Sequence, residues 1–422
     1  MIIPSIDIQE GRAVQLERGR KKILDGGDPL ARLDELSVVG EVAVIDLDAA
    51  LGRGSNAALI RRMVRRAPCR VGGGIRDLES ARAWLDAGAE RIILGTAATP
   101  ELLSKLPAGR LIAAVDCEHG ARVVEGWRKS TGEDPLAAIV RLRELVSGFL
   151  LTQVEHEGMA AGFDRDLVER AIAAAGDARV TAAGGITRAQ EIKDLERMGA
   201  DAQVGVALYS GRLGLGDAFA ATLENGVGGL WPTVVCDENG RALGLVWSHR
   251  ESVAAAIDRR RGIYWSRSRR ELWVKGETSG NTQELLRAEL DCDRDALRFT
   301  VRQKNGFCHT GRRECWPDAF SLGHLERTLR SRRNGSAGES GTAKLLADPD
   351  LLAAKLREEA DELAAARGDD DVTSELADLV YFALVAATRS GVSLATVERE
   401  LALRARLVSR RPMRAKTAGE SE

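Results

Sequence analysis

The first half of the chain repeats itself at a spacing of about 110 residues. IPSIDIQEGRAV (residues 3–14) and IAAVDCEHGARV (112–123) each place an aspartate after an apolar run and a glycine four positions later, so that Asp7 and Asp116 lie 109 residues apart. Two glycine-rich pairs show spacings of 111 and 110 residues: VGGGI (71–75) with AAGGI (182–186), and ILGTA (93–97) with QVGVA (203–207). Three pairs at one spacing indicate two copies of one structural unit.

Short apolar segments alternate with amphipathic helical segments through residues 1–224. Eight segments are expected to be strands: 2–7, 42–46, 69–73, 91–95, 111–116, 148–152, 179–183 and 202–206. Buried strands that alternate with helices are typical of a parallel sheet. Eight such units, arranged as two halves, predict a (β/α)8 TIM barrel over residues 1–225, with an open doubly wound sheet as the alternative.

Two further domains are expected after the barrel. A glycine-rich linker (224–229) precedes residues 226–319, where strand-like runs, five of the seven tryptophans and a cysteine cluster predict a small α+β or mostly β zinc domain. Residues 320–422 have helical periodicity and predict an all-α helical bundle. Its helices are expected at 321–333, 348–367, 371–390 and 393–408, with a polar loop over 332–344 and a disordered tail after Pro412.

Charge and cysteine content exclude several classes of protein. Lys and Arg total 61 against 63 Asp and Glu, a balance that gives no support for a nucleic-acid partner. The chain has no run of 18 apolar residues and no secretory leader, so we expect no membrane partner and a cytoplasmic location. Six cysteines in 422 residues are too few for a disulfide scaffold.

The barrel is expected to place its active site at the C-terminal ends of its strands. Asp7 and Asp116 end the first and fifth strands and would face each other, as a general acid and a general base would. The glycine-rich ends of the other strands would offer backbone N–H groups to two phosphates, although glycines also serve simply to permit tight turns. The candidate phosphate-binding residues are Gly73, Gly74, Gly95, Thr96, Gly184, Gly185, Gly205 and Val206.

Several barrel segments resemble the histidine-biosynthesis isomerase that acts on the aminoaldose ProFAR. They are IIPSIDIQEGRAVQL (2–16), IDLDAALGRGSN (45–56), VGGGIRD (71–77), RIILGTAA (91–98) and AAGGIT (182–187). The resemblance implies an Amadori rearrangement in which Asp116 protonates the ribose ring oxygen, Asp7 removes the C2 proton and Thr152 lies near the substrate. The family pattern after the sixth strand is TDxxxDG, whereas this chain has TQVEHEG (152–158), with Gln153 and Glu157 in place of aspartates.

The middle region groups metal-ligating residue types. Cys292, Cys308 and Cys315 can supply three thiolates to zinc, which leaves a fourth position for water. Asp291, Asp293 and Asp295 alternate around Cys292, so an extended strand would place all three on one face, as Mg²⁺ would require. A structural zinc knuckle beside a solvated acidic strand is the alternative.

The same region resembles phosphoribosyl-AMP cyclohydrolase. The resemblance lies in LGLVWSHRESV (243–253), YWSRSRRELWVKGETSGNTQ (264–283), LDCDRDALRF (290–299) and CHTGRREC (308–315). It implies hydrolytic opening of the adenine ring between N1 and C6 by zinc-bound hydroxide, with His309 as a proton carrier. Phosphate or ribose contacts are implied for Arg267, Lys275, Thr278 and Ser279. In this family Cys292 would come from the other subunit, which implies a homodimer.

Acidic residues also recur at helical spacing near the C-terminus. Glu358, Glu359 and Glu362 share one face of a predicted helix, and Glu375 and Asp378 begin the next. Like charges at these spacings repel, so a divalent cation is the natural compensator, and a solvated acidic face is the alternative.

This EExxE…ExxD pattern resembles phosphoribosyl-ATP pyrophosphohydrolase. The resemblance implies Mg²⁺-assisted attack of water between the α and β phosphates. The family's Tyr-His is Tyr381-Phe382 here, and its phosphate loop is Ser340-Gly341-Thr342, with Lys344 and Arg332 as further phosphate-binding candidates.

Read from the C-terminus, the three resemblances describe consecutive reactions of histidine biosynthesis. The expected substrates are phosphoribosyl-ATP, phosphoribosyl-AMP and ProFAR, and the expected cofactors are Zn²⁺ and Mg²⁺. Two alternatives remain for the barrel: a non-catalytic scaffold, or a broader isomerase that also accepts phosphoribosylanthranilate.

Overall fold

The computed structural model describes residues 1–422 except 18–20, 158, 160–161, 318–319, 335–339 and 410–422. The chain divides into two compact units. The first contains residues 1–237 and 242–313 together with a C-terminal segment from Arg406, and the second contains residues 238–241 and 314–405. The tail after Pro412, expected to be disordered, lies outside the described residues.

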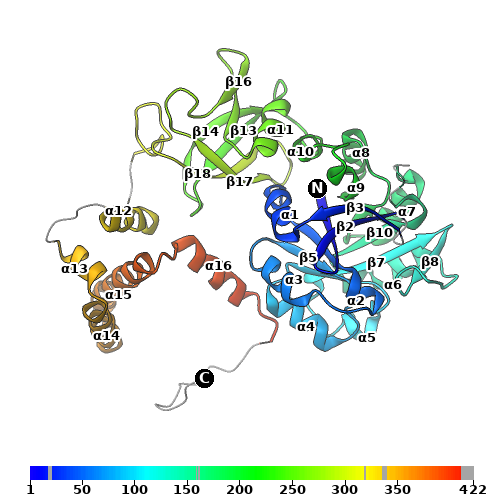
Figure 1. Ribbon diagram of the computed structural model, residues 1–422, viewed down its shortest axis with the longest axis horizontal. Coiled ribbons are helices and arrows are strands. Elements are labelled where there is room, and N and C mark those ends of the chain that lie inside the picture. Colours follow the sequence, from blue (N-terminus) through cyan, green and yellow to red (C-terminus); the bar gives the residue numbers. More distant parts are fainter. Residues whose placement is uncertain (18–20, 158, 160–161, 318–319, 335–339, 410–422) are drawn as a thin grey trace. The chain divides into compact units, whose positions relative to one another are not determined.

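The first unit contains a closed barrel of eight parallel strands (Figure 1). The strands are β1 (Ile2–Gln9), β4 (Val42–Asp46), β5 (Cys69–Gly72), β6 (Arg91–Leu94), β7 (Leu111–Glu118), β10 (Gly148–Gln153), β11 (Arg179–Ala183) and β12 (Asp201–Val204). Pairing of β10 with β7 closes the ring, and all eight predicted strands are present. The prediction of a (β/α)8 barrel is confirmed, and the open sheet is excluded.

Helices surround the ring of strands (Figure 1). They are α1 (Pro29–Leu36), α2 (Leu47–Leu51), α3 (Ala57–Val64), α4 (Leu78–Ala87), α5 (Pro100–Leu103), α6 (Pro135–Leu142), α7 (Arg165–Ala175), α8 (Ala189–Met198), α9 (Val206–Tyr209) and α10 (Leu215–Ala220). Aspartates cap several of them: the carboxylates of Asp28, Asp77, Asp134 and Asp164 accept backbone N–H groups in the first turns of α1, α4, α6 and α7. The caps explain why these helices begin where they do.

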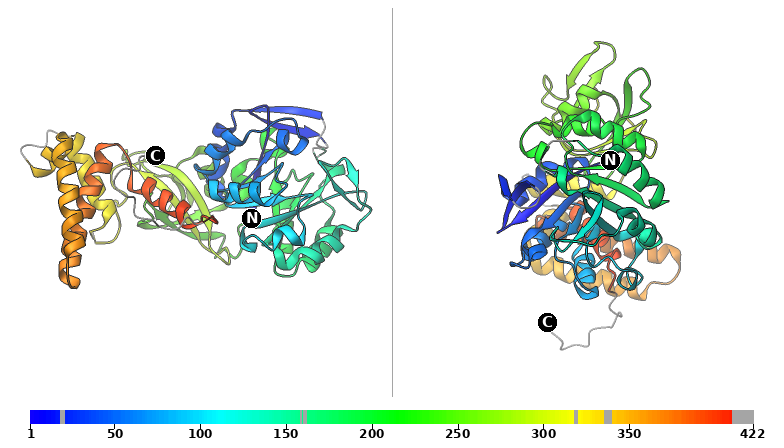
Figure 2. Two further views of the ribbon diagram at one scale, coloured as in Figure 1. Left: turned by 90° about the horizontal axis from the view of Figure 1, so that it is seen from below. Right: turned by 90° about the vertical axis from the view of Figure 1, so that its right-hand side faces the viewer.

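Both halves of the barrel extend into a β-hairpin at the same place. β1 continues past Asp7 and pairs with β2 (Arg12–Glu17), which pairs with β3 (Lys21–Gly27). β7 continues past Asp116 in the same way and pairs with β8 (Ala121–Val124), which pairs with β9 (Lys129–Ser130). The two aspartates have equivalent partners, Val14 and Val123. The repeat seen in the sequence therefore includes these hairpins, and Figure 2 shows the dark blue one projecting from the barrel.

A small α+β domain completes the first unit. Its four-stranded sheet has the order β14 (Ala242–His249), β13 (Leu230–Cys236), β18 (Leu297–Gln303) and β17 (Gln283–Leu290). A hairpin of β15 (Ile263–Ser266) and β16 (Glu271–Val274) and the helix α11 (Arg250–Arg259) accompany it.

Close packing joins this domain to the barrel. The backbone N–H of Gly216 in α10 donates to Asp258 of α11 at 2.8 Å, and a Cβ at Gly216 would lie 2.3 Å from the carbonyl oxygen of Ala254. Arg250 also donates to the carbonyl oxygen of Leu223 at 2.5 Å. Buried side chains of the barrel and the small domain form one continuous core, so the two domains make up one compact unit.

The second unit is helical. It contains α12 (Leu322–Asn334), α13 (Gly341–Ala347), α14 (Pro349–Ala365), α15 (Asp369–Arg389) and α16 (Leu394–Ala405). The long helices α14 and α15 lie side by side, in the orange part of Figures 1 and 2. Their core contains Leu329, Leu345, Leu352, Leu384 and Val385.

The sequence did not predict helix α13. We expected a polar loop over 332–344, but α12 continues to Asn334 and residues 341–347 are helical, while 335–339 lie outside the described residues. Ser340 accepts the backbone N–H of Ala343 at 3.2 Å, and Leu345 packs into the core. The N-cap of Ser340 and the burial of Thr342 and Leu345 stabilise this short helix within the bundle.

Among the residues that the structure describes, no single helix has the length and apolar character needed to cross a membrane, although the bent pair α15 and α16 meets those criteria when taken together.

Candidate active sites

Asp7, Asp116 and Thr152 lie together at the mouth of the barrel. Thr152 on β10 is in register with Asp116 on the neighbouring β7, and its hydroxyl hydrogen-bonds to the Asp116 carboxylate. The side chain of Trp127, beyond β8, forms a second hydrogen bond with Asp116. The register of two parallel strands thus orients one of the predicted catalytic carboxylates.

Burial dominates the electrostatics of this site. Loss of solvent raises the pKa of Asp7 from 3.8 to about 7. Burial also raises the pKa of Asp116, although the hydrogen bonds from Trp127 and Thr152 and the charge of Arg122 oppose the shift. Burial thus shifts the pKa of both carboxyl groups in the same direction, and at Asp116 neighbouring groups oppose the shift.

A third carboxyl group, Glu157, joins the pair. It follows β10 and caps the short 3-10 turn Val154–His156. Burial, and then the charges of Asp7 and Asp116, raise its pKa from 4.5 to about 8. The sequence identified Glu157 only as a replacement for a family aspartate. Its position, five residues beyond Thr152, was the signal that could have placed it at the site.

Gln153, the other replacement after β10, has a structural contact. Its Oε1 accepts the backbone N–H of Asp164 at 2.7 Å, directly before α7, and the side chain is buried. Gln153 therefore holds the backbone of Asp164, the residue that caps α7.

The paired glycines make close backbone contacts. Gly73 and Gly184 have φ values of +92° and +96°, and a Cβ would lie 2.3 Å from the carbonyl oxygen of Asp46 or 2.7 Å from that of Gln153. Gly74 and Gly185 are equally confined. Backbone packing thus explains these four glycines whether or not they also bind phosphate. Gly95 differs, because a Cβ there would meet nothing within 4 Å.

One small cavity gathers the candidates from the second half of the repeat. It is lined by Ser5, Glu157, Gly184, Gly185, Gly205, Val206 and Arg212, among others. Arg212 was not identified from the sequence and is the cation of this cavity. In the first half, Thr96 accepts the backbone N–H of Glu125 at 3.1 Å.

The aspartates around Cys292 lie on a turn, not on the extended strand that we expected. β17 ends at Leu290, and the chain reverses through residues 291–296 with Arg294 at φ +65°. The turn nevertheless brings the oxygens of Asp291, Asp293 and Asp295 within 4.8 Å of one another. Repulsion, chiefly from Asp293, raises the pKa of Asp295. Three exposed carboxylates at this spacing suit a hard divalent cation.

The three predicted zinc ligands do not form one group of neighbouring ligand atoms in the described residues. Cys308 is buried and accepts a hydrogen bond from the hydroxyl of Thr310 at 3.2 Å, while Cys292 and Cys315 are exposed. Within the described part of the chain, every group of three side chains that could hold a metal consists of carboxylates alone. His309 is exposed, with Nδ1 3.8 Å from the Cys308 sulfur.

The expected phosphate contacts of the small domain differ in exposure. Thr278 and Ser279 are exposed, and so is Arg267, whose guanidinium lies over the ring of Trp247. Lys275 is buried, and its ammonium donates to the carbonyl oxygen of Phe307 at 2.7 Å.

In the helical unit the predicted carboxylates converge. Glu358, Glu359 and Glu362 form one group on α14, and Glu359 forms a second with Glu375 and Asp378 of α15. Glu359 belongs to both groups and is buried, whereas Glu358 and Glu362 are exposed. Desolvation and the neighbouring Glu362 raise the pKa of both Glu359 and Glu375. The set has the oxygen ligands and the mutual repulsion that a bound Mg²⁺ would relieve.

Three polar side chains of α12, α13 and α15 are linked by hydrogen bonds in the same unit. Arg332 donates to the Thr342 hydroxyl at 2.8 Å, and that hydroxyl lies 2.8 Å from the hydroxyl of Tyr381. The predicted phosphate-binding residues Arg332 and Thr342 are thus in contact, and Tyr381 joins them. Lys344 lies two residues beyond Thr342 on α13 and is exposed.

A family model described as "Histidine biosynthesis protein" matches residues 1–214, half of the chain. An imidazole-4-carboxamide isomerase from Halobacterium salinarum is 38% identical over 235 residues, which cover 52% of this chain and 96% of that protein. The chain belongs to the histidine biosynthesis protein family. Two more models match beyond the barrel: phosphoribosyl-AMP cyclohydrolase over residues 244–317 and phosphoribosyl-ATP pyrophosphohydrolase over 322–405.

Fungal histidine biosynthesis proteins are also similar to this chain. A histidine biosynthesis trifunctional protein from Saccharomyces bayanus is 49% identical over 185 residues, 43% of this chain and 23% of that protein. A histidine biosynthesis bifunctional protein from Schizosaccharomyces pombe is 46% identical over 195 residues, 46% of each chain. The match to this chain therefore spans about a quarter of the trifunctional relative and about half of the bifunctional one.

Proposed function

We propose that this histidine-biosynthesis protein catalyses three consecutive steps. Phosphoribosyl-ATP loses pyrophosphate, the adenine ring of phosphoribosyl-AMP is opened hydrolytically, and ProFAR is isomerised to the aminoketose PRFAR. The observation that carries the proposal is the order of three matched segments, each of which has its own group of neighbouring carboxylates. Soluble phosphorylated substrates favour the cytoplasm as its compartment.

In the isomerase step, Asp116 would act as the general acid and Asp7 as the general base. Asp116 donates a proton to the ribose ring oxygen, which opens the ring, and Asp7 then removes the C2 proton. Thr152 and Trp127, which oppose the upward shift of the Asp116 pKa, would help Asp116 to release that proton. The pKa of Asp7 is about 7, which suits this carboxyl group to a reversible proton transfer near neutral pH.

The cyclohydrolase step needs residues from two chains in this proposal. Zinc would be held by Cys308 and Cys315 with Cys292 of a second copy, which is why we propose a homodimer through the small domain. Bound there, zinc would supply an activated water at neutral pH. His309, whose Nδ1 lies 3.8 Å from the Cys308 sulfur, would carry a proton, and the turn of Asp291, Asp293 and Asp295 would hold Mg²⁺.

The pyrophosphohydrolase step would use the helical unit. Glu358, Glu359, Glu362, Glu375 and Asp378 would hold Mg²⁺, which would neutralise phosphate charge during attack by water. Arg332 and Thr342 would bind phosphate oxygens, with Lys344 as a further cation.

Product analysis tests the whole proposal. The purified full chain would be given phosphoribosyl-ATP with Mg²⁺ and Zn²⁺, and the accumulating product identified. PRFAR is the expected product. Accumulation of ProFAR would leave the two hydrolytic steps standing and make the barrel a scaffold. In that case a parallel assay with phosphoribosylanthranilate would test the barrel for a different isomerase substrate.

A further inference from the structure

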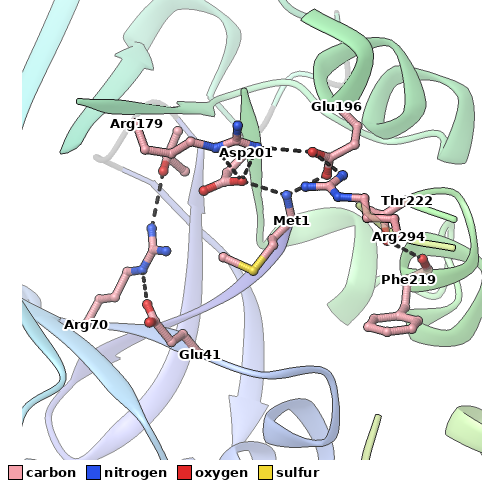
Figure 3. Close-up of polar contacts among 10 residues, drawn as sticks. Met1, Glu41, Arg70, Arg179, Glu196, Asp201, Phe219, Thr222 and Arg294 are labelled. Atoms are coloured by element: carbon pink, nitrogen blue, oxygen red, sulfur yellow. Dashed lines mark hydrogen bonds and ion pairs between the residues drawn. The ribbon is translucent and has the colours of Figure 1, made fainter. Parts of the chain in front are cut away.

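The acidic turn of the small domain is held at its tip by residues outside that domain. Arg294, between Asp293 and Asp295, forms an ion pair with Glu196 on α8 of the barrel (Figure 3). Asn225, in the segment that follows the barrel, donates its Nδ2 to the carbonyl oxygen of Asp293 at 3.3 Å. The turn that presents three candidate metal ligands is therefore docked on the barrel.

Glu196 is a fixed partner for Arg294. Its side chain is only 3% exposed and also accepts a hydrogen bond from Arg179 at 3.0 Å. Arg179 in turn donates to Asp201 at 2.8 Å, so the carboxylate of Glu196 is part of an ordered network (Figure 3). A pair with one immobile, buried partner loses less side-chain entropy than a pair between two exposed chains, and water screens it less.

The backbone of the turn is strained where the contact is made. Arg294 has a φ of +65°, a region that side chains other than glycine and asparagine rarely adopt. Such strain persists only where the surrounding contacts over-determine the conformation. The base of the turn is closed by Asp291 and Ala296, whose backbone groups pair at 3.2 Å, so the contact with Glu196 restrains the tip.

The barrel and the small domain also line a cavity of about 420 Å³ beside this contact. Arg70 and Arg179 contribute to its barrel wall, and Leu290, Asp291 and Cys292 to the opposite wall. The turn thus borders an open space while its tip is restrained, and Asp291, Asp293 and Asp295 remain exposed for a ligand.

We propose that the base of the barrel positions the metal-binding turn of the small domain, with Arg294 as the positioning residue and Glu196 as its anchor. The inference rests on the proposed cyclohydrolase function of that domain. Because three mutually repelling carboxylates must be held within reach of one cation, releasing the tip lowers the affinity of the turn for Mg²⁺. The barrel would then support the cyclohydrolase in addition to its own reaction.

Variants of the full chain test this proposal. Arg294→Gly removes the ion pair and also relieves the positive φ, so that a loss cannot be ascribed to added strain. Glu196→Gln removes the anchor's charge, and Arg294→Lys preserves the cation. Arg302→Ala is the matched control, because it removes an exposed pair with Glu284 on the same sheet.

Two measurements are made on each variant: the Mg²⁺ concentration for half-maximal cyclohydrolase activity, and hydrogen–deuterium exchange of residues 290–297 in the metal-free chain. We expect Arg294→Gly and Glu196→Gln to raise the Mg²⁺ requirement about tenfold, the lower end of the effect of losing a direct partner of a metal ligand, because these residues act only through the turn. Exchange in the turn should accelerate, Arg294→Lys should restore most of the affinity, and Arg302→Ala should change neither quantity.

Wild-type Mg²⁺ dependence and wild-type exchange in Arg294→Gly would overturn the proposal. Isomerase activity of each variant, measured in parallel, shows whether the barrel remains folded. If the wild-type chain had no cyclohydrolase activity, the proposed function would fail instead, and accelerated exchange in Arg294→Gly would still support the docking of the turn.

Discussion

The barrel mouth contains three carboxyl groups whose pKa values are all raised. Asp7 and Glu157 reach about 7 and about 8, and Asp116 is shifted in the same direction. At neutral pH the site therefore retains protons that free carboxylic acids would have lost. Carboxyl groups that are partly protonated at neutral pH suit the proposed aldose–ketose isomerisation, because one group must donate a proton and another must accept one.

Asp7→Asn should abolish isomerisation and spare both hydrolytic activities. The amide has the shape of the aspartate but cannot accept the C2 proton. In the wild type, isomerase activity should rise as the pH passes through about 7, because the base must be ionised. The check is a pH profile of ProFAR consumption for the wild type beside the variant, and unchanged isomerisation in Asp7→Asn would sink the assignment of the base.

Glu157→Gln should stabilise the barrel at alkaline pH. A carboxyl group whose folded pKa is raised contributes stability that is complete below about 4.5 and is lost as the pH rises through about 8. The neutral glutamine avoids that loss, so we expect a gain of about 2 kcal/mol near pH 9, which vanishes near pH 4. Thermal unfolding across this range provides the measurement, and a gain that is independent of pH would contradict it.

Turns and helices present the remaining candidate sites. At the strand ends of the barrel, positive φ values and backbone contacts demand glycine at Gly73 and Gly184 but not at Gly95. In the helical unit, the carboxylates come together because α14 and α15 lie side by side. Substitutions at these elements can separate a structural role from a binding role.

Gly73→Ala and Gly95→Ala form such a comparison. A Cβ at Gly73 would clash with Asp46, so we expect a loss of stability of about 2 kcal/mol or more. At Gly95 the Cβ has room, so stability should be unchanged, and a raised KM for ProFAR would indicate that its backbone approaches phosphate. Thermal unfolding and isomerase kinetics decide the matter; a wild-type KM in Gly95→Ala would argue against a phosphate contact there.

Glu359→Gln should cause the largest loss of pyrophosphohydrolase activity among the helical carboxylates. Glu359 is the buried member shared by both groups, so its loss weakens each of them. We expect a fall of about a hundredfold or more, with a higher Mg²⁺ requirement. Glu400→Gln on α16, an exposed glutamate paired with Arg404, is the control. Equal pyrophosphohydrolase activity in the two variants would show that Glu359 is not a ligand of the proposed Mg²⁺.

At the level of the full chain, three proposed activities are arranged along one polypeptide. The barrel and the small domain share a core, whereas the helices form a compact unit of their own. Damage to one site should therefore stop the reaction sequence at one intermediate and leave the other sites intact.

Cys308→Ser should lose zinc and stop the sequence at phosphoribosyl-AMP. The serine hydroxyl is a poorer zinc ligand than a thiolate. Metal analysis of the purified chain and identification of the accumulated nucleotide check both parts, and isomerisation of added ProFAR should be unaffected. A fully active variant that retains zinc would refute the ligand assignment.

The amino-acid sequence was sufficient for features that depend on local pattern. Eight buried strands follow from short apolar runs, the acidic faces of two helices from a period of 3.6 residues, and the twofold repeat from a spacing of about 110 residues. None of these patterns needs knowledge of distant contacts. Asp7 and Asp116 could be placed for the same reason, since the ends of parallel strands meet at one face of a barrel.

Other features depend on residues that meet only after folding. Glu157 becomes part of the barrel mouth through the turn after β10, and its pKa depends on burial beside Asp7 and Asp116. The aspartates around Cys292 lie on a turn because β17 and β18 pair as a hairpin, and Glu196, about a hundred residues earlier, receives Arg294 from that turn. Burial and long-range contact decide these features, because side chains separated by a hundred residues carry no local sequence signal of their meeting.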